Sequence, residues 1–364
     1  MKRKLGILLL VMVMVVGTLA GCASSGSSEE SETVIAGFLY VGPADDGGWS
    51  QVHDQGRAKM VEYFGGSVET IVKENVAEEK SEVISSIRDM VDQGATIIFG
   101  TSYGFMEGMA EAAEEFPDVK FEHCSGYMTA DNMATYFGKI EEPRYLSGIV
   151  AGMTTRTNKI AYVAAMPIPE VIRGINAFAL GVKSVNPNAQ VMVSWTNTWY
   201  DPTAEKAAAE ALIQQGCDVT AQHQDSTATM EAAKEAGIYS VGYDLSAAET
   251  MPEVYLTAPL WDFSGYYIDR VQAVIDGTWE TGQYWGNMND GIVYLDDMTS
   301  LVSGAAVSSV ETAEAAIKSG SLVIFAGEIK DQTGTVRVQT GSAMTDEALL
   351  SMDWFVDNVV GTLE

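Results

Sequence analysis

Hydrophobic runs and helix-like repeats alternate along the first part of the chain. Residues 33–41 are rich in β-branched and aromatic side chains and end at Gly42-Pro43, which predicts a buried strand. Residues 51–64 carry apolar side chains at helical spacing and stop at Gly65-Gly66, which predicts a helix. The alternation continues, with strands predicted at 67–72, 96–99 and 119–123 and helices at 79–93 and 106–116. Elements that alternate at intervals of about 30 residues are typical of right-handed βαβ units around a parallel sheet.

The same pattern restarts in the second part of the chain, after a boundary at 154–158. It predicts strands at 159–164, 190–195, 218–221 and 238–242, helices at 169–185, 202–215 and 227–236, and a later helix at 264–275. We therefore predict an α/β fold of two Rossmann-like lobes, residues 33–154 and 155–260. Residues 261–364 would cross between the lobes and complete both. Ligands of open parallel sheets bind outside the carboxyl ends of the strands, so we expect a ligand cleft between the lobes.

The loops that follow the predicted strands carry aromatic and carboxylate side chains. An aromatic face can stack on a flat ring, which contributes about 0.5–1.5 kcal/mol per pair beyond the buried area. A carboxylate can accept hydrogen bonds from the N–H groups at the edge of that ring. The other interpretation of any one aromatic residue is packing within a lobe, and it weighs most for Tyr103 and Phe105. The predicted ligand contacts are Asp46, Trp49, Tyr103, Phe105, Trp199, Asp225, Asp244 and Trp261.

Composition narrows the classes of partner and chemistry. The 50 acidic and 21 basic residues give a net charge of −29, which disfavours nucleic acids and anionic membrane surfaces as partners. The three histidines lie far apart, and no Cys-x-x-Cys spacing, Walker-type loop, Gly-x-Ser-x-Gly or His-Glu-x-x-His motif occurs. We therefore expect no metal, no cofactor and no catalytic activity. Cys124 and Cys217 fall in different predicted lobes and are expected to remain separate thiols.

The N-terminus has the features of an export signal. Lys2, Arg3 and Lys4 precede an apolar run from Leu5 to Val16, too short for a confident membrane-spanning helix. Leu-Ala-Gly-Cys at 19–22 then resembles a bacterial lipobox, in which Cys22 is lipidated and becomes the first mature residue. We predict a signal peptide at 1–21, a lipidated Cys22, and a Ser-rich flexible tether over 22–32 that holds the protein at the outer side of a membrane.

Three internal motifs accompany this N-terminus. They are Asp-Asp-Gly-Gly-Trp-Ser-Gln at 45–51, Glu-Phe-Pro-Asp-Val-Lys-Phe at 115–121 and Gly-Tyr-Asp at 242–244. Together with the lipobox they resemble the basic membrane protein family of solute-binding lipoproteins, from Cys22 to at least Asp331. Members of that family are receptors for ABC importers, and the best-understood ones bind purine nucleosides. The resemblance implies a type I periplasmic-binding-protein fold with a hinge of three crossing strands and the ligand in the cleft.

The resemblance also implies roles for single residues. Trp49 takes the place of a Phe that stacks on the base in nucleoside-binding relatives, and Trp199 corresponds to a second stacking Phe. Asp244 corresponds to the carboxylate that holds the ribose hydroxyls. The chain departs from those relatives at Trp261, where they carry a Lys, and at residues 223–226, where they have a glycine-rich loop. A bulky ring in place of a cation, and the added acceptor Asp225, favour a free nucleobase such as adenine over a nucleoside.

The expected function is therefore that of a lipid-anchored, monomeric, extracytoplasmic component of an ABC importer, which binds a purine nucleobase or nucleoside and contacts a membrane permease. One alternative is a sensor of the same fold that signals to a membrane kinase. Another is a surface hydrolase of nucleosides, which the lack of an evident nucleophile and base disfavours. Two roles stay open: His223 either contacts the ligand or is structural, and Arg173 either pairs with Glu170 or faces the cleft.

Overall fold

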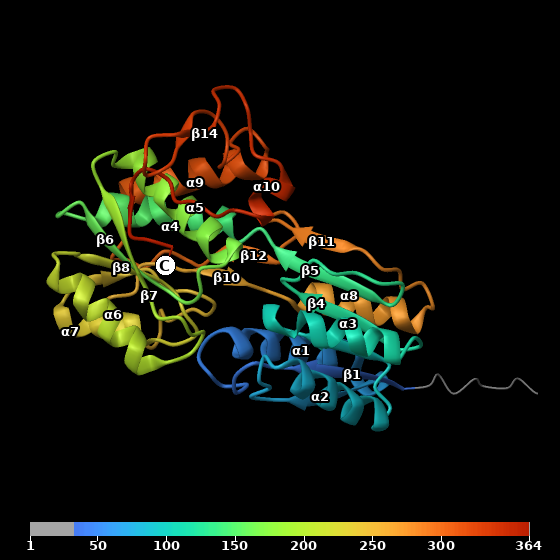
Figure 1. Ribbon diagram of the computed structural model, residues 1–364. Helices are drawn as coiled ribbons and strands as arrows, with labels where there is room; N and C mark the ends of the chain where they lie inside the picture. The colour runs from blue at the N-terminus through green and yellow to red at the C-terminus, as the bar shows by residue number, and fades with distance from the viewer. Residues whose placement is uncertain (1–32, 364) are drawn as a thin grey trace, which may run out of the picture. The chain divides into compact units, whose positions relative to one another are not determined.

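A computed structural model describes residues 33–363, so the predicted signal peptide, Cys22 and the tether lie outside the described residues. The first part of the described chain, together with one strand from its later part, builds a parallel sheet of six strands (Figure 1). In sheet order the strands are β11 (Gln283–Gly286), β5 (Met133–Gly138), β4 (Lys120–Cys124), β3 (Ile97–Gly100), β1 (Val34–Leu39) and β2 (Val68–Lys73). Two helices pack on each face. The pairs are α1 (Trp49–Phe64) with α8 (Ser264–Ile275), and α2 (Lys80–Asp92) with α3 (Met106–Glu115).

The second part builds a parallel sheet of five strands. In sheet order these are β15 (Val359–Val360), β7 (Gln190–Trp195), β6 (Lys159–Ala164), β8 (Val219–His223) and β9 (Tyr239–Ser240). The helix α5 (Pro169–Val185) covers one face of this sheet, and α6 (Pro202–Gln214) and α7 (Ala228–Ala236) cover the other. Parallel strands buried on both faces explain why the predicted strands read as continuous apolar runs.

The helix α4 (Glu141–Thr154) joins the two sheets and packs on α5. The two backbones cross closely: a Cβ atom at Gly148 would lie 2.1 Å from the carbonyl oxygen of Phe178, and one at Gly181 would lie 2.0 Å from that of Tyr145. Only glycine permits this approach at both positions. The lobe limits at residues 154 and 260 stay predictions.

Shorter elements complete the structure around α4. These are the antiparallel pairs β10 (Pro259–Trp261) with β12 (Val293–Leu295) and β13 (Ile329–Lys330) with β14 (Val336–Val338), and the helices α9 (Gly304–Lys318) and α10 (Asp346–Leu350). The chain passes between the two large sheets three times: after β5, between β9 and β11, and between β11 and β15. A two-sheet α/β architecture with three passages is the one that the sequence predicts.

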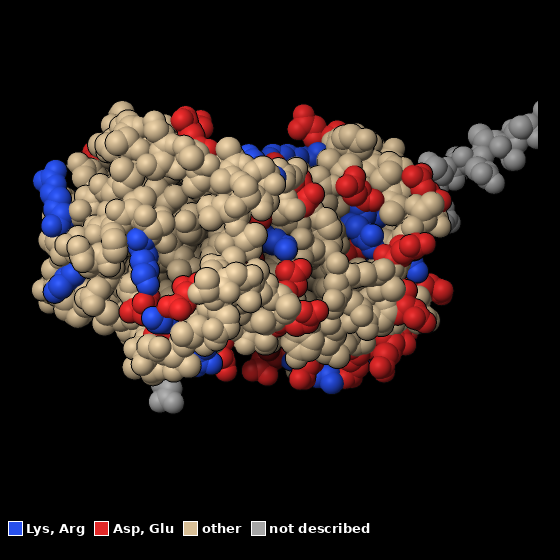
Figure 2. Space-filling model, turned by 90° about the horizontal axis from the view of Figure 1, so that it is seen from above, with Lys and Arg blue, Asp and Glu red and all other residues tan. Residues whose placement is uncertain are grey.

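Two further features of the described residues bear on the sequence predictions. Cys124 and Cys217 are both buried free thiols. Acidic side chains gather on the half of the visible face that belongs to the six-stranded sheet, whereas the other half shows fewer of them together with several Lys or Arg side chains (Figure 2). The negative net charge is therefore unevenly distributed over this face.

Candidate functional site

The loop between β1 and α1 is organised by Asp46. Its Oδ1 accepts hydrogen bonds from the backbone N–H groups of Gly48 (2.8 Å) and Gln51 (3.0 Å), and its Oδ2 accepts one from Ser50 (2.9 Å). These are the donors that the first turn of a helix leaves unpaired, so Asp46 acts as a cap for α1. The side chain does not line the cavity described below; it fixes the backbone that presents Trp49.

Trp49 is the first residue of α1 and lines a cavity at the carboxyl ends of the strands of both sheets. Its indole Nε1 donates a 2.7 Å hydrogen bond to the carbonyl oxygen of Thr101, which follows β3. The edge of the ring meets Trp261 and Phe263, with ring centroids 5.4 and 5.7 Å apart. A hydrogen bond at one end and edge contacts at the side hold the ring in one orientation.

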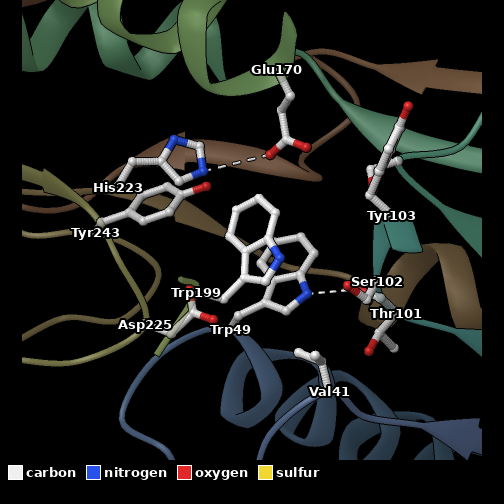
Figure 3. A pocket seen from close by; sticks show the side chains of 11 residues that line it. Val41, Trp49, Thr101, Ser102, Tyr103, Glu170, Trp199, His223, Asp225 and Tyr243 are labelled. Atoms are coloured by element: carbon white, nitrogen blue, oxygen red, sulfur yellow. Dashed lines mark hydrogen bonds and ion pairs between the residues drawn. The ribbon is translucent and has the colours of Figure 1, made fainter. Parts of the chain in front are cut away.

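The space between the lining side chains amounts to about 360 Å³ when the solvent at its mouth is included, and only about 20 Å³ of it can hold the centre of a water molecule. Figure 3 shows the side chains around it: Trp49 and Trp199 lie in the middle, Tyr103 at one side, and Glu170, His223 and Tyr243 above. The lining residues come from loops of both sheets and are Val41, Trp49, Thr101, Ser102, Tyr103, Ser125, Glu170, Trp199, His223, Asp225 and Tyr243. Four of the eight predicted contacts, Trp49, Tyr103, Trp199 and Asp225, therefore lie together.

Asp225 and Trp199 come from neighbouring loops of the second sheet, where the backbone N–H of Asp225 donates to the carbonyl oxygen of Trp199 (3.2 Å). The Asp225 carboxyl is 5 % exposed and makes no hydrogen bond within residues 33–363. Burial, with the nearby carboxylates of Asp244 and Asp46, raises the pKa of Asp225 well above its ordinary value. The loop also touches the first sheet's loop: a Cβ at Gly48 would lie 2.4 Å from the carbonyl oxygen of Asp225.

Asp244 and Trp261 lie next to Trp49 but do not line the cavity. The Trp261 indole Nε1 donates a 3.1 Å hydrogen bond to Oδ1 of Asp244, and the Trp261 ring stacks on Phe263 at 5.3 Å. Asp244 Oδ2 is buried with no hydrogen-bond partner among the described residues. Burial raises the pKa of Asp244 well above its ordinary value against the opposing field of Arg144. The predicted contact of either residue with a ligand stays a prediction.

Phe105 does not line the cavity either. It is fully buried in the core between the six-stranded sheet and the helices α2 and α3. Tyr103 and Phe105 belong to one short 3₁₀ turn. Successive residues of such a turn are about 120° apart, so residues two positions apart point in different directions. Phe105 therefore packs within the first half of the molecule, which is the alternative interpretation given for this residue in the sequence analysis.

The cavity wall contains six polar residues that were not among the predicted contacts: Thr101, Ser102, Ser125, Glu170, His223 and Tyr243. His223 Nε2 lies 3.6 Å from Glu170 Oε1. Burial, together with the charge of Arg144, lowers the pKa of His223 to about 4, so this histidine is neutral at pH 7. His223 stands directly before the loop that carries Asp225, and Tyr243 stands directly before Asp244. Including every polar residue at the end of a predicted strand would therefore have identified both.

Two buried arginines lie near the site. Arg144 of α4 is fully buried, donates a 2.6 Å hydrogen bond to the carbonyl oxygen of Gln222, and places its guanidinium 3.7 Å from the centre of the Tyr243 ring. Its Nε and Nη2 have no partner in the described part of the chain. Arg173 pairs with Glu141 at 3.2 Å and donates to the carbonyl oxygen of Leu349. The expected alternative partner, Glu170, is not the one it uses.

The described residues contain no group of three or more His, Cys, Asp or Glu side chains placed to hold a metal ion. Over the same residues, no helix is both long and apolar enough to cross a membrane. The site therefore consists of aromatic faces, buried carboxyl groups and a neutral histidine around one small cavity.

Two α/β halves around such a cavity define a solute-binding protein of the periplasmic-binding-protein type. A sequence profile described as ABC transporter substrate-binding protein, PnrA-like, matches residues 33–334, and the chain belongs to this family. A purine-binding protein of Brucella abortus is 42% identical over 95% of this chain and 98% of its own length. A Haloferax volcanii protein named as a putative ABC transporter glucose-binding protein is 43% identical over 83% of this chain and 76% of its own length.

A solved structure agrees with the fold. The ABC transporter solute-binding protein of Aeropyrum pernix superposes with a TM-score of 0.70 at 20% identity, covering 82% of this chain and 93% of its own. The chain is thus a solute-binding component of an ABC transporter, and the family pairs such a component with a membrane permease. The family consists of binding proteins and not of enzymes, and it does not favour the alternative of a kinase-coupled sensor.

Proposed function

We propose that this protein is a lipid-anchored, extracytoplasmic receptor for a free purine nucleobase, adenine-like, that it delivers to an ABC permease. The observation that supports the proposal most is that Trp49 and Trp199 line one cavity from opposite halves of the molecule. Two indole faces can hold a flat heterocycle between them, and stacking of a base on an aromatic side chain contributes about 1–3 kcal/mol. The purine-binding relative from Brucella abortus is consistent with this ligand class.

Asp225 is suited to the edge of the ring. Burial raises the pKa of the Asp225 carboxyl group, which favours its protonated form. That form offers one hydrogen-bond donor and one acceptor. Adenine presents a ring nitrogen acceptor beside its exocyclic amine, which is the complementary pair. An ionised carboxylate would offer acceptors only, and would suit the two N–H groups of guanine.

A free base is favoured over a nucleoside by the bond between Asp244 and Trp261. Asp244 corresponds to the carboxylate that holds ribose hydroxyls in nucleoside-binding relatives. Here its Oδ1 already accepts from the Trp261 indole, and that indole is itself 2% exposed and packed on Phe263. A ribose hydroxyl at this oxygen would have to compete with the indole N–H for the carboxylate.

The test of ligand class begins with mass spectrometry of small molecules released by denaturing the purified protein. Calorimetric titration then compares adenine, hypoxanthine, guanine, adenosine and glucose. We expect adenine to bind at least about tenfold more tightly than adenosine, and glucose not to bind. Tight binding of adenosine with no binding of any free base would overturn the choice of nucleobase. Binding of glucose alone would overturn the purine class and favour the sugar ligand that the Haloferax volcanii relative's name gives.

The lipid anchor has a separate test. Cells that express the full chain are fed a labelled fatty acid, and the label is expected on the wild-type protein and absent from Cys22→Ser. The variant is expected to leave the membrane fraction, because one residue carries the anchor. A variant that stays in the membrane fraction would overturn the anchor, with no consequence for the ligand.

A further inference from the structure

A second cavity adjoins the first and shares Tyr103, Ser125 and Glu170 with it. It encloses about 1440 Å³ of unoccupied space, part of it open to solvent, against about 360 Å³ for the first. We call it the aromatic vestibule. Its lining includes the aromatic residues Tyr127, Tyr136, Phe137, Tyr284 and Trp285, together with residues of α5 and α10.

The rim of the aromatic vestibule is apolar and exposed. Tyr127 is 63% exposed, Leu350 52% and Tyr284 36%, and all three line the same cavity. Apolar side chains that gather at a cavity mouth, instead of lying singly on the surface, are typical of a binding site. Contact with an apolar group would remove part of this surface from water.

The charges on the wall restrict what can occupy it. Three carboxylates line the aromatic vestibule, those of Glu170, Asp346 and Glu347. Two cations of the described residues lie at this wall, and both are paired. The guanidinium of Arg173 is held by the buried carboxylate of Glu141 and by the carbonyl oxygen of Leu349. The ammonium of Lys139 lies 4.5 Å from the centre of the Trp285 ring and 3.4 Å from Oδ1 of Asp346. The described part of the chain therefore offers no unpaired cation there for a phosphate or carboxylate group, and Glu170 and Glu347 would repel one.

One wall of the aromatic vestibule lies outside the part of the chain that matches the family. The profile ends at residue 334, whereas α10 begins at Asp346 and contributes, with the residue after it, four lining residues: Asp346, Glu347, Leu350 and Ser351. The hydrogen bond from Arg173 to Leu349 fixes α10 against α5.

We propose that the aromatic vestibule is a subsite for an apolar or aromatic substituent, uncharged or cationic, carried by the purine ring that the first cavity holds. The shared residues place the substituent's attachment between Tyr103 and Glu170, away from Asp244 and Trp261. The ligand class is then substituted purine bases, and phosphorylated purines are excluded. This inference rests on the function proposed above.

Calorimetry with matched ligands tests it. The probes are adenine, 6-benzylaminopurine, 9-benzyladenine and the 4-carboxybenzyl analogue of whichever benzyl compound binds better. We expect at least one benzyl compound to bind as tightly as adenine or more tightly. The carboxylated analogue is expected to bind about tenfold or more weakly, because its charge meets an acidic wall.

A double substitution at the rim of the aromatic vestibule tests where the substituent binds. Tyr127→Ser with Leu350→Ser is expected to weaken the benzyl compound about fivefold and to change the affinity for adenine less than about twofold. Both positions are exposed, so the variant is expected to fold. The matched control is Tyr63→Ser with Val323→Ser, at positions 65% and 52% exposed that do not line either cavity, and it should change neither affinity.

The outcomes separate the two proposals. If no purine binds, the proposed function fails and the subsite fails with it. If adenine binds but both benzyl compounds lose more than about tenfold in affinity, the subsite is overturned and the proposed function stands. The subsite is likewise overturned if the rim variant leaves the benzyl compound's affinity unchanged, or if the carboxylated analogue binds equally well.

Discussion

The buried carboxyl groups of the molecule fall into two kinds. Some have their hydrogen-bond partners, as Glu122 does in the first half and Glu205 in the second, whereas two beside the cavity in the second half lack some or all of them. In the first half, Glu122 of β4 is fully buried and receives three donors. Its Oε1 accepts from Arg270 Nε (2.5 Å) and Trp279 Nε1 (2.7 Å), and its Oε2 accepts from the Tyr266 hydroxyl (2.7 Å). In the second half, Asp244 receives one donor, and Asp225 receives none within residues 33–363.

The difference separates structure from function. A buried polar group without partners costs about 1–3 kcal/mol, so a fold tolerates one only where something compensates for it. Glu122 has three hydrogen-bond donors as partners. These bonds join β4 to α8 and to the segment that follows α8. Asp225 and Asp244 keep hydrogen-bonding capacity beside a cavity. Unsatisfied capacity beside a cavity is what a ligand-binding site requires, and the second half supplies it.

The largest effect is expected from breaking the satisfied group. Glu122→Gln should lower the free energy of unfolding by about 3 kcal/mol, because it leaves the partly buried guanidinium of Arg270 without its carboxylate. Urea unfolding measures this, and the affinity for purine should not change. The control, Glu115→Gln, breaks an exposed pair with Arg88 and should cost less than about 1 kcal/mol. Lost affinity with unchanged stability would reverse the assignment of Glu122.

Trp199→Ala tests the stacking face of the second half. We expect it to weaken ligand binding by about 1–3 kcal/mol, and Trp49→Ala to do the same from the first half. The matched control is Trp195→Ala, four residues earlier, whose ring stacks on Phe355 and which does not line the cavity. Titration of all three variants decides the matter: equal affinities for Trp199→Ala and Trp195→Ala would contradict stacking at Trp199.

Asp225→Ala tests the unsatisfied group. Removing the carboxyl should weaken purine binding by about 1.5 kcal/mol, because a ligand donor or acceptor loses its partner. The free energy of unfolding should stay the same or rise, since the variant removes a buried carboxyl that has no hydrogen bond within residues 33–363. Calorimetry and urea unfolding on one protein preparation give both quantities. A loss of stability without a loss of affinity would place Asp225 with Glu122 as a structural group.

The smallest effect concerns the neutral histidine. The pKa of His223 is about 4 in the folded protein and about 6.5 in the unfolded chain, so below pH 6.5 the unfolded chain takes up a proton that the folded one does not. Stability is therefore lost as the pH falls. Between about pH 7 and pH 5.5 the wild type should lose about 1 kcal/mol more than His223→Gln. Parallel pH profiles for the two proteins would show that His223 is not held neutral.

Periodicity predicted most strands and helices of the two sheets, but it missed the helix α4 and the strand β5. The helix α5 occupies 169–185, as the apolar spacing and Pro169 predict. The sequence carries no comparable signal for α4, because that helix contains Pro143 and two glycines and is buried on almost every side. Without a polar face, a helix has no amphipathic period to read. Burial of all six residues of β5 removes the alternation that marks a half-exposed strand in the same way.

The sequence located the loops that follow the strands, but it did not show in which direction their side chains point. Trp49 and Asp46 are three residues apart, yet one lines the cavity and the other caps a helix. The direction of each depends on backbone angles that residue type alone leaves open. Glu170 was missed because a carboxylate in the first turn of a helix is ordinarily explained by the helix dipole. Its place on the cavity wall depends on how the two sheets meet.

The close approach of Gly48 to Asp225 restricts which residues can replace Gly48 in related proteins. Backbone meets backbone there with no side chain between, so the spacing of the two loops is set by the chain itself. Any descendant that exchanges Gly48 for a larger residue must widen this gap by the thickness of a methyl group or more, and so admit solvent to the indoles on either side. Homologues that keep glycine at this position can keep the two loops at this distance. Homologues with a larger residue there must space the loops differently, and their site would then suit a different ligand.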